Sequence, residues 1–193
     1  MVKKRVNSMR KGSAFERDIC KKLSLWFSHG ERDDLFHRTA GSGARSTTRA
    51  KKGKNTANSA GDIGYLDVAG KPLIDAITFE LKCGYNHVDT TSLIDTLSHN
   101  KKPQLLEFVR QAVESARNAQ TKYWAVVHRR NGKRVLIHFS LSLWERICEF
   151  RYEYVQWTVV PCGENMTQRI ISMPLEQFLE KVSPEIFMEK EDS

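Results

Sequence analysis

The sequence predicts a mixed α/β domain in which helices flank a central group of strands. Three observations indicate this class: an apolar repeat at helical spacing opens the chain, strand-forming runs follow it, and a second apolar helical repeat interrupts the strands. Alternation of helices with groups of strands is typical of layered α/β domains. At 193 residues, the chain is long enough for one well-buried domain and short for two.

The first predicted helix begins near Ser13, because Ser13–Glu16 has the spacing of a capping box. Apolar residues then recur at helical spacing, and the helix is expected to end around His29-Gly30. Residues 1–10 should form a flexible basic arm ahead of it. Leu35–Arg38 is a short strand candidate after it.

A long segment without acidic residues follows this strand. Residues 39–61 contain five Lys or Arg and many Gly, Ser, Thr and Asn, so we expect a mobile basic loop that cannot pack a core. Two strand candidates come next, at residues 62–68 and 73–83, and the turn-forming residues 69–72 join them.

The rest of the chain alternates helices and strands around two clear features. The helix at Pro103–Ala119 has one apolar face, and Asn131-Gly132 indicates a β-hairpin turn. The other predicted elements are strands at Tyr123–His128 and Arg134–Phe139, a short helix at Leu141–Phe150, strands at Val155–Val160 and Arg169–Ser172, and a helix at Pro174–Val182. Residues 184–193 are rich in charge and are expected to form a solvated tail.

The positive charge is concentrated at one end of the chain. Residues 1–60 hold 15 Lys and Arg against 5 Asp and Glu, a balance of +10, whereas residues 61–193 hold 16 against 18, a balance of −2. A basic surface can serve solubility alone. An excess confined to one segment instead favours binding to a polyanion such as DNA, because neutralised phosphates release counterions.

The cysteines and the apolar runs exclude other classes of protein. The four cysteines form no Cys-x-x-Cys pair, which favours reduced thiols over a disulfide framework or a zinc site. No apolar run approaches the roughly 20 residues that span a bilayer, and the N-terminus lacks the apolar stretch of a signal peptide. We therefore expect a cytoplasmic protein with no membrane contact, associated with the nucleoid or acting in a virus-infected cell.

Asp62, Glu80 and Lys82 form the strongest chemical pattern. Side chains alternate along a strand, so Glu80 and Lys82 share one face, and Asp62 can add a carboxylate from a neighbouring strand. Two carboxylates suffice for Mg²⁺, with the Leu81 carbonyl as a further ligand, and Lys82 can orient or deprotonate the attacking water. An isolated Glu-x-Lys is usually a surface ion pair. The aspartate and the basic segment favour a metal-dependent nuclease instead.

Four short motifs follow one another in a recognisable order: Gly12-Ser13 with Glu16-Arg17, Arg38–Gly43, Gly61–Ile63 and Glu80–Lys82. Together they resemble the PD-(D/E)xK nuclease superfamily, and within it the archaeal-type Holliday-junction resolvases and related phage enzymes. The resemblance covers about residues 11–110, and residues 120–193 match no motif. It implies a restriction-endonuclease-like fold with a mixed central β-sheet flanked by helices, dependence on Mg²⁺ with Mn²⁺ as a substitute, a homodimer, and cleavage of structured DNA.

The resemblance also implies roles for single residues. Asp62, Glu80 and Lys82 match the core triad, and Glu16 matches a first-helix acid that binds metal directly or through water; a capping-box partner is the alternative for Glu16. Ser42 falls in the Gly-Ser-Gly loop, whose serine lies near the phosphate, unless it is an ordinary loop residue. A long basic segment after Ser42 departs from the family pattern, as does glycine, in place of proline, before Asp62.

DNA contacts are implied for residues around this core. Arg38 precedes the serine loop, and Gln104 resembles a glutamine that opens the helix after the core, although it can also serve only as a helix cap. Basic residues of the long loop are expected to contact phosphates without reading sequence. They are Arg45, Arg49, Lys51, Lys52 and Lys54.

The sequence predicts a metal-dependent DNA endonuclease that forms a single domain over residues 1–193. The predicted activity is the resolution of Holliday junctions or other branched DNA by a homodimer. Two alternatives stay open. One is a nicking or restriction-type endonuclease on duplex DNA that uses residues 120–193 for target choice. The other is a non-catalytic DNA-binding protein with a decayed nuclease fold, against which the intact Asp62, Glu80 and Lys82 argue.

Overall fold

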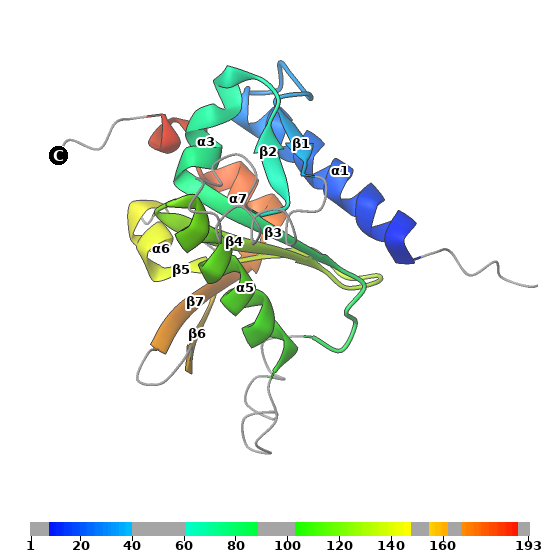
Figure 1. Cartoon of the computed structure of the whole chain (residues 1–193), viewed down its shortest axis with the longest axis vertical. Helices are drawn as coiled ribbons and strands as arrows, with labels where there is room; N and C mark the ends of the chain where they lie inside the picture. Colours follow the sequence, from blue (N-terminus) through cyan, green and yellow to red (C-terminus); the bar gives the residue numbers. More distant parts are fainter. Residues whose placement is uncertain (1–7, 40–60, 89–102, 148–154, 162–166, 189–193) are drawn as a thin grey trace, which may run out of the picture.

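The computed structural model describes residues 8–39, 61–88, 103–147, 155–161 and 167–188 (Figure 1). The strands are β1 Phe36–Arg38, β2 Ile63–Tyr65, β3 Ile77–Cys83, β4 Tyr123–Arg129, β5 Val135–Ser140, β6 Gln156–Pro161 and β7 Thr167–Pro174. The α-helices are α1 Ser8–Phe27, α3 Lys71–Ala76, α5 Gln104–Ala119, α6 Leu141–Ile147 and α7 Leu175–Lys181, and two short 3₁₀ helices are η1 Val68–Gly70 and η2 Pro184–Phe187.

Five strands form one mixed sheet in the order β3-β4-β5-β7-β6. Strands β3 and β4 are parallel, with Glu80 opposite Val126, and the other neighbours are antiparallel. Parallel strands need a crossover, and the segment that contains α5 supplies it. A separate antiparallel pair, β1 with β2, holds the residues that flank the long basic segment.

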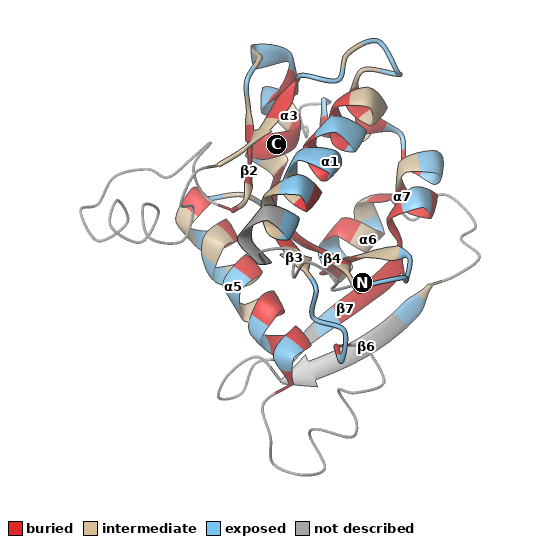
Figure 2. Ribbon diagram, turned by 90° about the vertical axis from the view of Figure 1, so that its right-hand side faces the viewer, coloured by how far each residue is buried: buried red, intermediate tan, exposed pale blue. Residues whose placement is uncertain are grey.

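Helices cover both faces of the sheet, giving three layers (Figure 2). On one face, α5 packs on Trp124 and Val126 of β4. On the other, α1, α6 and α7 pack on alternate residues of the same strands, such as Phe79, Ala125 and Phe139. This two-faced burial confirms the predicted mixed α/β class with a central sheet flanked by helices. In the described part of the chain, no helix is long and apolar enough to cross a membrane.

Several boundaries differ from the prediction. The strand predicted at residues 62–68 is limited to β2, Ile63–Tyr65, and Val68 begins the 3₁₀ helix η1. Helix α1 begins at Ser8 rather than near Ser13, so residues 8–10 belong to a helix and not to the predicted basic arm. Residues 73–76, predicted as strand, complete α3, because Pro72 opens a helix that buries Leu73 and Ile74; a short apolar run fits either element. Residues 184–187, predicted as part of the solvated tail, form η2, which packs Phe187 into the core.

The end of α1 and the hairpin follow the prediction. His29 adopts a left-handed conformation, and the amide of Gly30 donates to the carbonyl of Leu25 at 2.6 Å, which closes the helix as in a Schellman motif. Between β4 and β5, Gly132 has a φ of +67°, as expected for the Asn131-Gly132 turn.

Two histidines are buried on the face of the sheet that α5 covers. His128 and His138 are 2% and 1% exposed, and their rings lie 6.1 Å apart. Burial lowers the pKa of His128 to about 4 and that of His138 to about 3, and the nearby positive charge of Arg130 acts in the same direction. Ser172 lies 2.7 Å from Nδ1 of His138. Both rings are therefore neutral in the folded protein near neutral pH.

Mild acid should destabilise the fold through these histidines. The pKa of each histidine is lower in the folded protein than the ordinary 6.5, so the unfolded chain binds more protons in mild acid. The contribution of the two histidines to the free energy of unfolding is therefore complete above pH 6.5 and is lost as the pH decreases toward 4. His138→Gln should reduce this loss, and His87→Gln, at an exposed site, should leave it unchanged. Urea unfolding at several pH values measures it; an equal acid loss in His138→Gln would contradict the assignment.

Candidate active site

Gly61 and Asp62 approach the backbone of β3 closely. The amide of Asp62 donates to the carbonyl of Phe79 at 2.7 Å, and the Asp62 carboxylate accepts from the amide of Leu81 at 2.8 Å. Gly61 has a φ of +73°, and a Cβ there would lie 2.5 Å from the Phe79 carbonyl oxygen. Proline requires a φ near about −65°. Glycine is thus the residue that lets Asp62 reach β3 in this chain.

Glu80 and Lys82 project from β3 toward α5. One carboxylate oxygen of Glu80 accepts from Lys82 Nζ at 3.1 Å, and the other accepts from the hydroxyl of Ser115 on α5 at 2.9 Å. The Lys82 ammonium also lies 5.5 Å from the centre of the Phe108 ring. The two side chains of the pair are only 10% and 16% exposed, so they form a mostly buried pair and not the surface ion pair considered from the sequence.

Arg38 joins β1 to α1 through two side chains. Its guanidinium donates to the Glu16 carboxylate at 3.0 Å and to the Ser13 hydroxyl at 2.5 Å. The capping box predicted at Ser13–Glu16 is wrong, because both residues lie inside α1. Their polar groups instead hold Arg38 at the edge of the site, where its side chain is 37% exposed.

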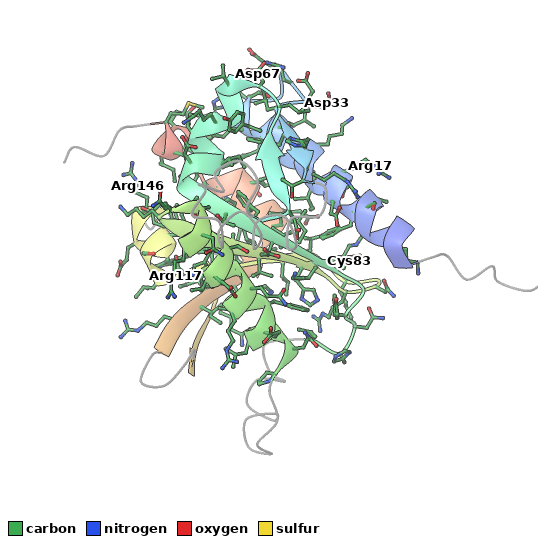
Figure 3. All side chains as sticks on the ribbon, viewed as in Figure 1. Arg17, Asp33, Asp67, Cys83, Arg117 and Arg146 are labelled. Carbon is green, nitrogen blue, oxygen red and sulfur yellow. The ribbon has the colours of Figure 1, made fainter. Side chains whose placement is uncertain are left out.

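A pocket of about 410 Å³ lies where α1, the Asp62 segment and the end of β3 meet. Figure 3 labels Cys83 at the end of β3 and Arg17 on α1, the two elements that flank this region. The pocket is lined by Gly12, Phe15, Glu16, Asp62, Leu81, Lys82, Cys83 and Tyr85. It therefore brings together two predicted carboxylates and the predicted lysine from three separate segments.

The carboxylates of the site act on one another electrostatically. Burial, and then the negative charge of Asp62, raise the pKa of both Glu16 and Glu80. Arg38 opposes this shift at Glu16, and Lys82 opposes it at Glu80. Asp62 thus lies within electrostatic reach of both glutamates, and the cluster is a place where a bound cation would relieve repulsion.

The donor atoms at this site fit a hard divalent cation. Carboxylate oxygens of Glu16 and Asp62 line one pocket, and Glu80 lies on the strand to which Asp62 is bonded. Across the residues that the structure describes, no group of three or more His, Cys, Asp or Glu forms a ready metal cage. Mg²⁺ keeps several waters and needs only one or two carboxylates, so this donor set suits Mg²⁺ or Mn²⁺ better than Zn²⁺.

The other predicted site residues have different outcomes. Gln104 opens α5 with an exposed side chain, one turn before Phe108, and its contact with DNA stays a prediction. Leu81 uses its amide to hold Asp62, and its carbonyl as a metal ligand also stays a prediction. Ser42 and the basic loop residues lie outside the described residues: Arg45, Arg49, Lys51, Lys52 and Lys54.

Sequence reasoning missed Ser115 and Tyr85. Ser115 lies seven residues after Phe108, on the face of α5 that packs against the sheet. A small hydroxyl residue within an apolar stripe is the sequence pattern that could have indicated its role. Tyr85 lines the pocket, is 40% exposed, and packs its ring edge-on against Phe108 with the centroids 4.9 Å apart. Nothing in its sequence spacing marked it.

A carboxylate-lysine pair on a strand next to a bonded aspartate, within a mixed sheet that helices flank, is the arrangement of a PD-(D/E)xK nuclease. Residues 7–189 match the family model described as "Phage putative PDDEXK endonuclease". The match covers nearly the whole chain, so the chain belongs to this family and is an endonuclease of the PDDEXK type, with the restriction-endonuclease-like fold expected of it. No curated protein and no solved structure matches the chain.

Removal of the Ser115 hydroxyl should impair cleavage by freeing the Glu80 carboxylate. Partners that orient a functional carboxylate are typically worth about 10-fold to 100-fold in activity, so Ser115→Ala should lower the cleavage rate by about 10-fold. Ser115→Thr keeps the hydroxyl and should restore most of the rate. Ser172→Ala, which removes another hydroxyl on the same sheet face, is the matched control. Equal rates for Ser115→Ala and wild type would refute a positioning role.

Proposed function

We propose that the protein hydrolyses phosphodiester bonds of DNA with the help of a divalent metal ion. One observation carries the proposal: Asp62 is hydrogen-bonded to the strand that presents Glu80 and Lys82, so two carboxylates and an ammonium group surround one short stretch of β3. Hydrolysis of a phosphodiester needs an activated water and stabilisation of negative charge, and these groups can provide both with a metal ion.

The residues divide these tasks. Asp62 and Glu80 would hold the metal ion, with Glu16 as a further ligand, directly or through water, and with the carbonyl of Leu81. Mg²⁺ suits these oxygen donors, and Mn²⁺ should substitute. When bound, the ion would lower the pKa of its water and stabilise charge on the phosphoryl oxygens. Lys82 is held next to Glu80 and can orient or deprotonate that water, or bind the scissile phosphate.

Asp62→Asn and Glu80→Gln should each lower DNA cleavage by about 100-fold or more, because each removes one negative charge from the metal site. DNA binding should persist in both variants, and calorimetry should show weaker binding of Mn²⁺. Asp75→Asn is the matched control, since Asp75 is an exposed acid paired with Lys71 outside the site. Full cleavage by Asp62→Asn or Glu80→Gln would exclude this metal site.

We infer that the preferred substrate is branched DNA, with the Holliday junction as the first candidate. The support is the motif similarity to archaeal-type junction resolvases, together with the +10 charge balance of residues 1–60. Ser42, Arg38, Gln104 and the basic loop would contact the DNA backbone. Two symmetric cuts at a junction need two sites, so a homodimer accompanies this proposal. Cleavage would occur in the cytoplasm, where phage and host DNA are both accessible.

A panel of labelled DNA substrates tests this inference. With Mg²⁺, the protein should introduce paired symmetric nicks into a four-way junction and cut matched linear duplex, flap and single-stranded DNA far more slowly. EDTA should abolish all cleavage. Preferential cutting of linear duplex would replace junction resolution with a nicking or restriction-type activity. Tight binding without any cutting would instead favour a non-catalytic protein.

A further inference from the structure

The turn between β4 and β5 carries a dense cluster of positive charge. Four of the six residues from Arg129 to Arg134 are Arg or Lys, and none is acidic. This cluster is an exception in the chain after residue 60, because residues 61–193 hold 16 basic and 18 acidic residues. Residues 131–134 are exposed. A general need for a basic surface does not explain such a local concentration.

Two of these cations are available to an external partner. Within the described ranges, Lys133 and Arg134 form no ion pair or side-chain hydrogen bond with the protein. Arg129 has a different role, since its guanidinium lies 4.6 Å from the centre of the Phe15 ring and donates to the Cys83 sulfur at 3.4 Å. Arg129 therefore anchors the base of the turn, and Lys133 and Arg134 extend beyond it.

Backbone hydrogen bonds hold the turn against the segment that follows the catalytic strand. The amide of Gly84 donates to the carbonyl of Arg129 at 3.0 Å, and the amide of Asn131 donates to the side-chain oxygen of Asn86 at 2.8 Å. The amide of Lys133 closes the turn on the carbonyl of Arg130 at 3.3 Å. The turn is thus tied to β3 and does not project as an independent loop.

The parallel pairing of β3 and β4 places this turn at the same edge of the sheet as the active site. Lys82 lies opposite His128, and Cys83 lies opposite Arg129, so the turn begins where the catalytic strand ends (Figure 1). Phe15 and Cys83, the two side chains that Arg129 contacts, both line the pocket. Strand residues rise by about 3.3 Å each, so the tip of the turn lies about 10 Å beyond Arg129 at most.

We propose that the turn Arg129–Arg134 binds the DNA backbone next to the scissile phosphate, with Lys133 and Arg134 as the phosphate ligands. The proposal rests on the DNA-cleaving function and adds a binding element from the part of the chain that matched no motif. In duplex DNA, each strand carries one backbone charge per 3.4 Å or so of helix axis, so a reach of about 10 Å along the axis corresponds to roughly three nucleotides. Such contacts fix the position of the strand and read no sequence.

The salt dependence of DNA binding tests the proposal. The double variant Lys133→Gln/Arg134→Gln should reduce the slope of log K against log salt by about 1.8, and Lys133→Gln alone by about 0.9, since each lost phosphate contact contributes about 0.9 on duplex DNA. Fluorescence anisotropy in EDTA, from about 50 to about 200 mM salt, measures binding without cleavage. In cleavage assays, the double variant should raise KM and leave kcat close to that of wild type.

A charge-matched control separates local contact from net charge. Lys71→Gln/Lys122→Gln removes two exposed positive charges at the opposite end of β3 and β4 and should leave the slope unchanged. An unchanged slope in the Lys133/Arg134 variant would overturn the proposal and leave the nuclease function intact. Equal decreases in both double variants would also overturn it. Failure of the wild-type protein to bind DNA would instead overturn the proposed function itself.

Discussion

The site depends on the contact between the Gly61-Asp62 segment and the backbone of β3. Asp62 uses both its amide and its carboxylate to bond to this strand, at 2.7 and 2.8 Å. The contact requires a residue without a Cβ at position 61, because the Phe79 carbonyl occupies that space. Because Asp62 directly precedes β2, the same contact also places the β1–β2 pair, which contains Arg38, next to the sheet. Glycine at position 61, where the resemblance implies proline, therefore has a steric reason in this chain.

Two cations from different layers offset part of the negative charge of the site. Arg38 lies between β1 and α1 and holds Glu16, whereas Lys82 lies under α5 and holds Glu80. Asp62 is hydrogen-bonded to β3, and burial, followed by the negative charge of Asp62, raises the pKa of both glutamates. Charged groups that are half-buried in this way destabilise the folded protein unless further hydrogen bonds reach their polar atoms. The hydrogen bond from Ser115 to Glu80 is one such bond.

The parallel pairing of β3 with β4 organises the functional edge of the molecule. Because β3 ends at the same edge as β4, the first turns of α1 and the basic β4–β5 turn lie near each other there (Figure 1). The pocket lies at this edge too, since Gly12 and Phe15 of α1 and Leu81, Lys82 and Cys83 of β3 line it. The crossover through α5 has a second effect, since it covers Glu80 and Lys82 and brings Phe108 and Ser115 to them. The parallel pairing of β3 with β4 thus determines both the buried side of the site and the exposed surface that we propose to bind DNA.

Local patterns in the sequence were enough to predict the fold class, the Pro103–Ala119 helix, the Asn131-Gly132 hairpin and the shared face of Glu80 and Lys82. These features depend on periodicity and turn chemistry, which neighbouring residues determine. The capping box at Ser13 and the strand at residues 73–76 were wrong, because the same residues also suit a helix interior, and packing against β1 and the sheet selected that state. Only tertiary structure could bring Ser115, Tyr85 and Arg129 to the site. Each comes from a different element, and their proximity is set by strand pairing and helix packing between residues far apart in the chain.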